Sequence, residues 1–467
     1  MRPGNRRNHC MKRLIAVMIS ALMMLSLAAC GSTNTGTEQN SEKSAAAVSE
    51  PSEAAAEEAA EEETKESSAV SEDEESENEP QDSAEGFVPA LDTQIEATIN
   101  FVGSWGNFEA LDQVAIDFQQ YYPNVEVVYT KLDDYRNDLA NRFATGEEID
   151  LFMTDWWDIA YPANLNIAEN AENLNGVGID FSNIEADLLS AGEYNGAQVM
   201  VPVYMMNWGY MVNLDIFEAA GAEVPTTYDE LLAACEKLAE AGYEQPIYVN
   251  TSQFARTFTG YYMEQRLAGN DENASLENTI AAIDGLVDTG YVSREGDDLE
   301  DNYNAIILKF FEGETPMVPI STNNFSGTQK REGKSEEFTA EPFSYAFIPA
   351  PYTETNSTFI DQLGSVYIGV YKDSQQIDLA NEFLRFMLSD EEMTELKNIK
   401  NMPSSNIYNG LEGFTYLDAA ERFYLDEEGI SSLDEEYILN VLTLYGTENY
   451  HDEMLAKMND YLENGFE

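Results

Sequence analysis

Short apolar runs alternate with helical repeats of apolar positions through residues 97–155. The apolar runs, which are typical of buried strands, cover 97–103 (ATINFVG), 124–130 (NVEVVYT) and 149–155 (IDLFMTD). The helical repeats cover 107–123 and 132–146. A strand–helix–strand–helix–strand order at this spacing predicts βαβ units and therefore an α/β fold built on a parallel sheet.

The two predicted helices carry their own signals for packing and for where they end. In the first helix the positions expected to share one buried face are Leu111, Val114, Ala115 and Phe118. Pro123 closes the first range and lies just beyond the last residue expected to be helical, and Gly146 is the expected C-terminal stop of the second helix.

Tryptophan and polar residues follow two of the predicted strands directly. The residues in question are Trp105, Gly106 and Asn107 after the first strand, and Asp155, Trp156 and Trp157 after the third. Ligands of open α/β sheets bind beyond the carboxyl ends of the strands, so this edge is the candidate site. Neighbouring side chains on a strand point to opposite faces. We therefore expect one of Trp156 and Trp157 to pack inward and the other to face a ligand. Asp155 has an alternative role as the N-cap of a following helix.

The pattern continues with a strand pair over 197–217, which we expect to pass from one sheeted body to another, and with a helix over 224–243. Thr227 and Glu230 predict a capping box at the start of this helix, and Gly242 predicts its end. Cys235 lies on the apolar face of the same helix, so we interpret it as a buried core thiol and not as a nucleophile.

The charge of the chain excludes several classes of function. The 467 residues carry a formal net charge of −63, with 24 basic and 87 acidic residues. Such a surface repels nucleic acid, and it offers no basic stripe to neutralise phosphates. The chain has two histidines and three cysteines without a CxxC pair, so we expect no metal site with nitrogen or sulfur ligands and no cofactor. The acidic stretch 295–301 lacks the EF-hand pattern, and we favour a solvated loop over a calcium site there.

The first 90 residues have the pattern of a targeting segment followed by a spacer. Basic residues precede an apolar run over 14–29, which is short for a membrane span and typical of a signal peptide, here residues 1–29. The run ends in LAAC, which resembles the lipobox of bacterial lipoproteins and implies cleavage before Cys30 and lipidation of its thiol. Residues 30–90 are mostly acidic and small, and we expect a disordered linker. The predicted location is the outer face of the cytoplasmic membrane.

Several stretches taken together resemble family 1 extracellular solute-binding proteins, the maltose-type receptors of ABC importers. They are FVGSWGNFEALDQVAIDFQQYYPNVEVVY (101–129), LANRFATGEEIDLFMTD (139–155), VPVYMMNWGYMVNLDIFEAAGAEVPTTYDELLAACEKL (201–238), FFEGETPMV (310–318) and DLANEFLRFMLSDEE (378–392). The resemblance implies two lobes joined by three crossovers, with the ligand between them. The implied ranges are 91–204 with 366–406 for the first lobe, and 207–362 with 408–467 for the second. The implied partners are a small carbohydrate and the permease subunits, and we expect the chain to be a monomer.

The resemblance also assigns candidate ligand contacts. The first lobe would contribute Trp105, Asn107, Asp155, Trp156 and Trp157. The crossovers would contribute Tyr204, Trp208, Gln362 and Ser365, and the second lobe Asn323, Asn324 and Phe325. For Tyr204 a role in packing at the hinge is an equally weighted alternative to ligand contact. The segment DQLGS (361–365) lacks the tryptophan that many relatives carry there, so the size of the sugar is left open.

These residue types suit a carbohydrate, because a pyranose covers an aromatic ring and its hydroxyl groups bind carboxylates and amides. A second hypothesis keeps the receptor but gives it a polyamine or quaternary amine, held by cation–π contacts and charge. A third is a surface glycosidase with paired carboxylates, although nothing in the sequence selects a pair.

Overall fold

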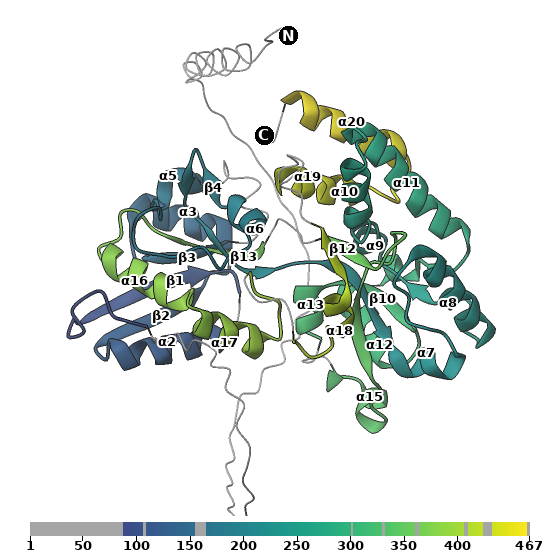
Figure 1. Ribbon diagram of the computed structural model, residues 1–467, viewed down its shortest axis with the longest axis horizontal. Helices are drawn as coiled ribbons and strands as arrows, with labels where there is room; N and C mark the ends of the chain where they lie inside the picture. Colours follow the sequence, from purple (N-terminus) through teal and green to yellow (C-terminus); the bar gives the residue numbers. More distant parts are fainter. Residues whose placement is uncertain are drawn as a thin grey trace, which may run out of the picture. The chain divides into compact units, whose positions relative to one another are not determined.

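The computed structural model describes residues 87–105, 109–154, 165–299, 302–328, 332–359, 364–405, 410–423 and 432–464. Within these ranges the chain forms two five-stranded sheets with flanking helices, together with two small two-stranded sheets (Figure 1). The predicted α/β class is confirmed. Residues 82–467 form one compact unit.

The first sheet has the strand order β2-β1-β3-β13-β6. Its strands are β1 (Ala97–Gly103), β2 (Val125–Lys131), β3 (Leu151–Thr154), β6 (Val201–Met205) and β13 (Gly364–Val370). The helices and small strands of the same part of the chain are α2 (Glu109–Tyr121), α3 (Tyr135–Thr145), α5 (Ile167–Asn170), α6 (Ala186–Ser190), β4 (Glu193–Tyr194), β5 (Ala197–Gln198), α16 (Ile377–Met387) and α17 (Asp390–Lys400). In Figure 1, α17 lies beside α2, although the two helices are far apart in sequence.

The second sheet has the strand order β11-β7-β10-β8-β9. Its strands are β7 (Trp208–Asn213), β8 (Ile247–Tyr248), β9 (Val292–Ser293), β10 (Met317–Ser321) and β11 (Tyr345–Pro349). The remaining elements are α7 (Leu214–Ala220), α8 (Tyr228–Glu240), α9 (Thr251–Arg256), α10 (Thr259–Leu267), α11 (Glu272–Asp288), η2 (Glu295–Asp298), α12 (Asn302–Phe311), α13 (Thr322–Ser326), α15 (Glu336–Ala340), β12 (Ser357–Phe359), α18 (Thr415–Ala419), β14 (Glu421–Phe423), α19 (Ser432–Leu442) and α20 (Tyr450–Asn464).

The predicted βαβ units are present, and in each sheet four of the five strands run in one direction while one strand, β13 in the first sheet and β7 in the second, is antiparallel to its neighbours. In the first sheet β1 pairs in parallel with β2 and with β3, whereas β13 is antiparallel to both β3 and β6. In the second sheet β7 is antiparallel to β10 and β11, and β8 is parallel to β9 and β10. The antiparallel strand β13 returns from the second part of the chain, so local periodicity does not reveal its direction.

The strand pair predicted over 197–217 does pass between the sheets, because β6 belongs to the first and β7 to the second. The predicted helix ends are also observed. The Thr227 side chain accepts a hydrogen bond from Glu230 N at the start of α8, and Gly242 has a positive φ just after its end. The Glu230 carboxylate, however, accepts from Thr226 N (2.8 Å), one residue before the expected partner of the capping box.

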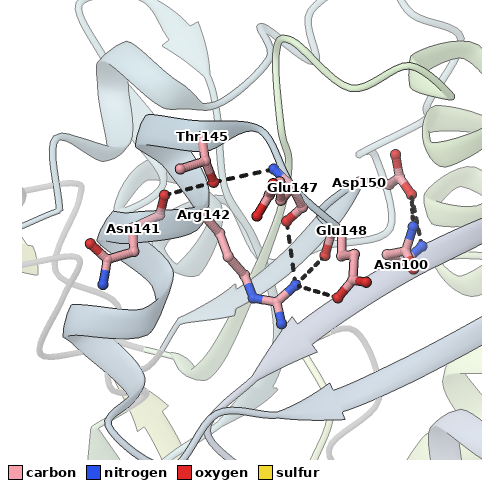
Figure 2. A network of polar contacts seen from close by, with 7 residues as sticks. All are labelled: Asn100, Asn141, Arg142, Thr145, Glu147, Glu148 and Asp150. Carbon is pink, nitrogen blue, oxygen red and sulfur yellow. Dashed lines mark hydrogen bonds and ion pairs between the residues drawn. The ribbon is translucent and has the colours of Figure 1, made fainter.

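The loop between α3 and β3 is held by a polar network (Figure 2). Gly146, in the left-handed conformation with φ of 69°, ends α3 as expected. The Arg142 guanidinium donates to the main-chain oxygen of Glu148 (2.6 Å). Asp150 is buried, and its carboxylate accepts from Asn100 N on β1 (2.7 Å). The contact between Asp150 and Asn100 holds the start of β3 beside β1 and so positions the carboxyl ends of the two strands relative to each other.

Candidate functional site

Three strands of the first sheet end at one edge. Because β1 and β3 are parallel, and β6 is antiparallel to β13, which is itself antiparallel to β3, strands β1, β3 and β6 run in the same direction. Trp105, Thr154 and Tyr204 lie at their carboxyl ends. The chain leaves the first sheet at this edge, where Met205 ends β6 and Trp208 begins β7.

The second sheet presents a matching edge at the same crossover. Trp208 pairs with Ser321 at the carboxyl end of β10, and α13 begins immediately after it. The Asn207 N–H donates to Thr322 Oγ1 (3.1 Å), and Thr322 N donates to Asn207 O (2.9 Å). Helix α9 follows the carboxyl end of β8, which is parallel to β10. The first crossover therefore joins strand ends of both sheets.

Trp105 is half-buried and is held by aromatic and cationic neighbours. Its ring stacks on Tyr204 with centroids 6.0 Å apart and planes at 13°. Lys400 Nζ, at the end of α17, lies 5.4 Å from the centroid of the Trp105 ring. The Tyr129 hydroxyl donates to Trp105 O (2.9 Å), which fixes the backbone just after β1.

Tyr204 and Trp208 mark the two ends of the crossover. Tyr204 is fully buried, and its hydroxyl donates to Leu396 O (3.0 Å). In this conformation Tyr204 therefore packs inside the protein and does not face a ligand. Trp208 is 9 % exposed, and the guanidinium carbon of Arg256 lies 5.5 Å from its ring centroid. Trp208 Nε1 is buried and has no hydrogen-bond partner within the described part of the chain.

The second-sheet candidates are placed differently from one another. Asn323 is half-buried, and its Oδ1 accepts from Ser321 Oγ (2.6 Å). Asn324 is likewise half-buried. Phe325 is only 2 % exposed and lies edge-on to Phe414 with centroids 4.9 Å apart, so its ring belongs to an aromatic core here.

Five candidate contacts lie outside the described residues: Asn107, Asp155, Trp156, Trp157 and Gln362. The backbone of Ser365 lies on β13, but the structure does not describe its side chain. Which tryptophan of MTDWWD faces a ligand therefore stays a prediction.

Sequence reasoning missed three residues of these edges. Thr154, the last residue of β3, is fully buried, and its Oγ1 has no hydrogen-bond partner among the residues described. Arg256 and Lys400 each lie over a tryptophan ring. The only signal in the sequence is that basic residues are few, and nothing local assigns these two to the strand ends.

Cys235 and the acidic stretch 295–301, both singled out by the sequence, have structural roles. Cys235 is buried and free, and burial raises the pKa of its thiol to about 12, as expected for a core residue. Asp297 in the acidic stretch accepts hydrogen bonds from Thr251 N (2.7 Å) and Asn250 Nδ2 (3.1 Å), and so it helps to begin α9. Within the described ranges no group of three or more metal-ligating side chains is placed to hold an ion.

Residues 83–394 match the family model of bacterial extracellular solute-binding proteins, and the chain belongs to this family. It is thus a member of a class of binding proteins with two α/β lobes. Within the described ranges, no helix combines the length and apolar character needed to cross a membrane. No curated protein matches the sequence.

Solved structures share the fold at low sequence identity. The GacH receptor of Streptomyces glaucescens, solved without ligand and with acarbose, is 17% identical, with a TM-score of 0.57 over 80% of this chain and 99% of that chain. An ABC substrate-binding protein of Listeria monocytogenes in complex with cycloalternan is 18% identical, with a TM-score of 0.53 over 80% and 100%. A de novo designed cysteine esterase is 16% identical, with a TM-score of 0.57 over 78% and 97%. At these identities the likeness concerns the fold alone, and the designed esterase illustrates that one fold hosts different activities.

Proposed function

We propose that this protein is the substrate-binding lipoprotein of an ABC importer, which captures a carbohydrate between two lobes and delivers it to the membrane permease. The observation that carries the proposal is the set of strand ends around the first crossover, with Trp105 and Trp208 on either side of it. The proposed lobes are residues 91–204 with 366–406 and residues 207–362 with 408–467. The membership of β13 in the first sheet supports this division.

The chemistry of these strand ends suits a sugar. An indole ring supplies apolar surface for the C–H face of a pyranose, and an amide such as that of half-buried Asn323 binds its hydroxyl groups. Two proteins of the same fold were solved with acarbose and with cycloalternan. Ligand would shift a hinge equilibrium toward a closed form, and the permease would bind that form.

The proposed anchor consists of a signal peptide over 1–29, lipid on Cys30 and a linker over 30–90. The last residues of this range contact helix α16. Arg385 donates to Val88 O (2.8 Å), and Glu382 accepts from Ala90 N (2.8 Å). Cys30→Ser should abolish incorporation of labelled palmitate and release the protein from membranes. Incorporation that persists in the variant would contradict lipidation at this position.

Ligand binding is best tested by thermal shift on the mature chain without its lipid, residues 30–467 with Cys30→Ser. The panel holds oligosaccharides, polyamines and betaines. A ligand at 100 times its dissociation constant adds about 2.7 kcal/mol to the free energy of unfolding, which shifts the midpoint visibly. We expect Trp105→Ala to lose the shift. Tyr243→Ala is the matched control, because Tyr243 precedes β8 and lies at the opposite edge of the second sheet.

The amine alternative is kept because the charge of −63 attracts cations. Stabilisation by amines alone would refute the carbohydrate ligand. We propose that the protein binds its ligand without catalysing a reaction. Cleavage of a bound oligosaccharide into shorter products would contradict this proposal.

A further inference from the structure

A cavity of about 590 Å³ opens at the edge of the second sheet that lies away from the crossover. Helices α7, α12 and α15 border it (Figure 1). Asn213, the last residue of β7, lines the cavity, whereas Trp208 begins the same strand at the crossover. Six residues of strand span roughly 17 Å, so the cavity is separated from the crossover by the length of the sheet. Its occupant would be a ligand distinct from one held at the crossover.

One wall of the cavity is a cluster of three phenylalanine rings. Phe311 is fully buried, and Phe338 packs edge-on to it with ring centroids 5.0 Å apart. Phe343 lies perpendicular to Phe338, with centroids 4.9 Å apart. Phe338 and Phe343 are only half-buried, so each leaves part of its ring surface to the cavity. Aromatic rings attract cations through their electron-rich faces, and quaternary ammonium groups are bound in this way.

The charged side chains that line the cavity are acidic. Among the described residues of the lining there is no lysine or arginine, and four carboxylates are present: Asp215, Glu312, Glu337 and Glu341. Glu312 is half-buried. Burial, and then the charges of Glu314 and Glu337, raise the pKa of Glu312, because these effects outweigh that of Lys309, which is ion-paired with Glu314 (2.5 Å). A cation in the cavity would relieve this repulsion.

Two helices of more than two turns also end at the cavity. Ala241, the C-cap of α8, and Phe311, the last residue of α12, both line it. The C-terminus of a helix carries about half a negative elementary charge, which favours a cation nearby. The backbone, the carboxylates and the aromatic rings therefore all favour the same kind of occupant, a cation with some apolar surface.

Asn213 adds a hydrogen-bond donor to this surface. It is 1 % exposed, and its Oδ1 accepts from Ile216 N (3.0 Å) at the start of α7. Its Nδ2 makes no hydrogen bond within the described part of the chain, and the residue lines the cavity. A donor that folding leaves without a partner gains when an acceptor arrives. An oxygen atom on the ligand would supply that acceptor.

We propose that this cavity is a second binding site, which takes a small organic cation composed of an ammonium group and a hydroxyl-bearing chain. The ammonium group lies against Phe338 and Phe343 beside Glu312, and the hydroxyl oxygen accepts from Asn213 Nδ2. The formal charge of −63 concentrates cations around the protein and so assists this site. The inference is independent of the proposed function, because it uses none of the residues at the crossover.

The test is isothermal titration calorimetry on the lipid-free mature chain at fixed ionic strength, since salt screens diffuse attraction of cations to an acidic surface. The probes are choline, ethanolamine and 3,3-dimethylbutan-1-ol, the uncharged carbon analogue of choline. We expect choline or ethanolamine to bind with a dissociation constant below about 1 mM, and about 10-fold or more tightly than the uncharged analogue. Phe338→Leu and Glu312→Gln should each weaken this binding about 5-fold or more, whereas Phe338→Tyr, which keeps the ring, should preserve it.

Two controls separate this site from diffuse attraction and from the crossover. Glu126→Gln makes the same change of charge at an exposed position of β2 in the first sheet and should leave binding unchanged. Trp105→Ala should also leave it unchanged, whereas Tyr243→Ala should weaken it, because Tyr243 lines the cavity.

Three results overturn the inference. They are no binding by either cation, binding of the uncharged analogue as tightly as choline, and equal weakening by Glu126→Gln and Glu312→Gln. Each of these leaves the proposed carbohydrate receptor standing. Loss of choline binding in Trp105→Ala but not in Phe338→Leu also overturns it, and would instead support the amine alternative at the crossover.

Discussion

Glu392 allows a quantitative prediction, because it is a buried carboxyl group without compensation. It lies in the first turn of α17, is 4 % exposed, and its Oε2 has no hydrogen-bond partner within the described ranges. Burial, and then the charges of Asp117, Glu395 and Glu391, raise its pKa from 4.5 to about 8. The folded protein therefore holds a proton that the unfolded chain releases near pH 4.5.

The sign of the linkage follows from this difference. Because the pKa of Glu392 is higher in the folded state, the contribution of this group to the free energy of unfolding is greatest below pH 4.5. It falls as the pH rises to about 8. Each pH unit in that window costs about 1.4 kcal/mol, so the sum approaches about 5 kcal/mol. Glu392→Gln removes the titration and should be more stable than the parent chain, by about 3 kcal/mol near pH 7 and more near pH 9.

The assay is urea unfolding of the lipid-free chain at about pH 5, 7 and 9, with tryptophan fluorescence as the readout. Glu236→Gln is the matched control, because Glu236 is an exposed glutamate of α8 and is not among the charges that raise the pKa of Glu392. Its difference from the parent should change little with pH. A Glu392→Gln variant whose stability differs from the parent by the same amount at every pH would show that Glu392 is not the buried neutral acid described.

Three further predictions concern stability and reactivity. Phe325→Ala should lower the free energy of unfolding by about 3–5 kcal/mol, measured by urea titration, because its ring is 2 % exposed in an aromatic core; a loss below about 1 kcal/mol would contradict that packing. Asp271→Ala should cost about 1 kcal/mol in the same assay, since the Asp271 carboxylate accepts from Ala274 N (2.8 Å) at the start of α11, and an unchanged midpoint would argue against the cap. In the Cys30→Ser chain, Cys235 should react with a thiol reagent only after unfolding, because burial raises its pKa to about 12; fast labelling of the native chain would refute its burial.

The sequence by itself determines those features that depend on one segment at a time. The spacing of Leu111, Val114, Ala115 and Phe118 predicts the buried face of α2. Leu111, Val114 and Phe118 are buried, and Ala115 is half-buried. Thr227 begins α8 and Gly146 ends α3 as predicted, since a cap is a contact within a few residues. The same local reasoning identifies the βαβ units, the burial of Cys235 and the placing of Trp105 just after a strand.

The neighbours of the candidate site residues are decided only by tertiary structure. Tyr204 and Lys400 are remote in sequence from Trp105 and reach its ring through β6 and α17. Periodicity reports which face of an element is buried, but not which other element covers it. The antiparallel direction of β13, the burial of Phe325 and the uncompensated carboxyl group of Glu392 all arise from packing between distant segments. For that reason the sequence alone predicts a receptor with aromatic residues at its strand ends, and only the packing of α9 and α17 reveals the cations beside them.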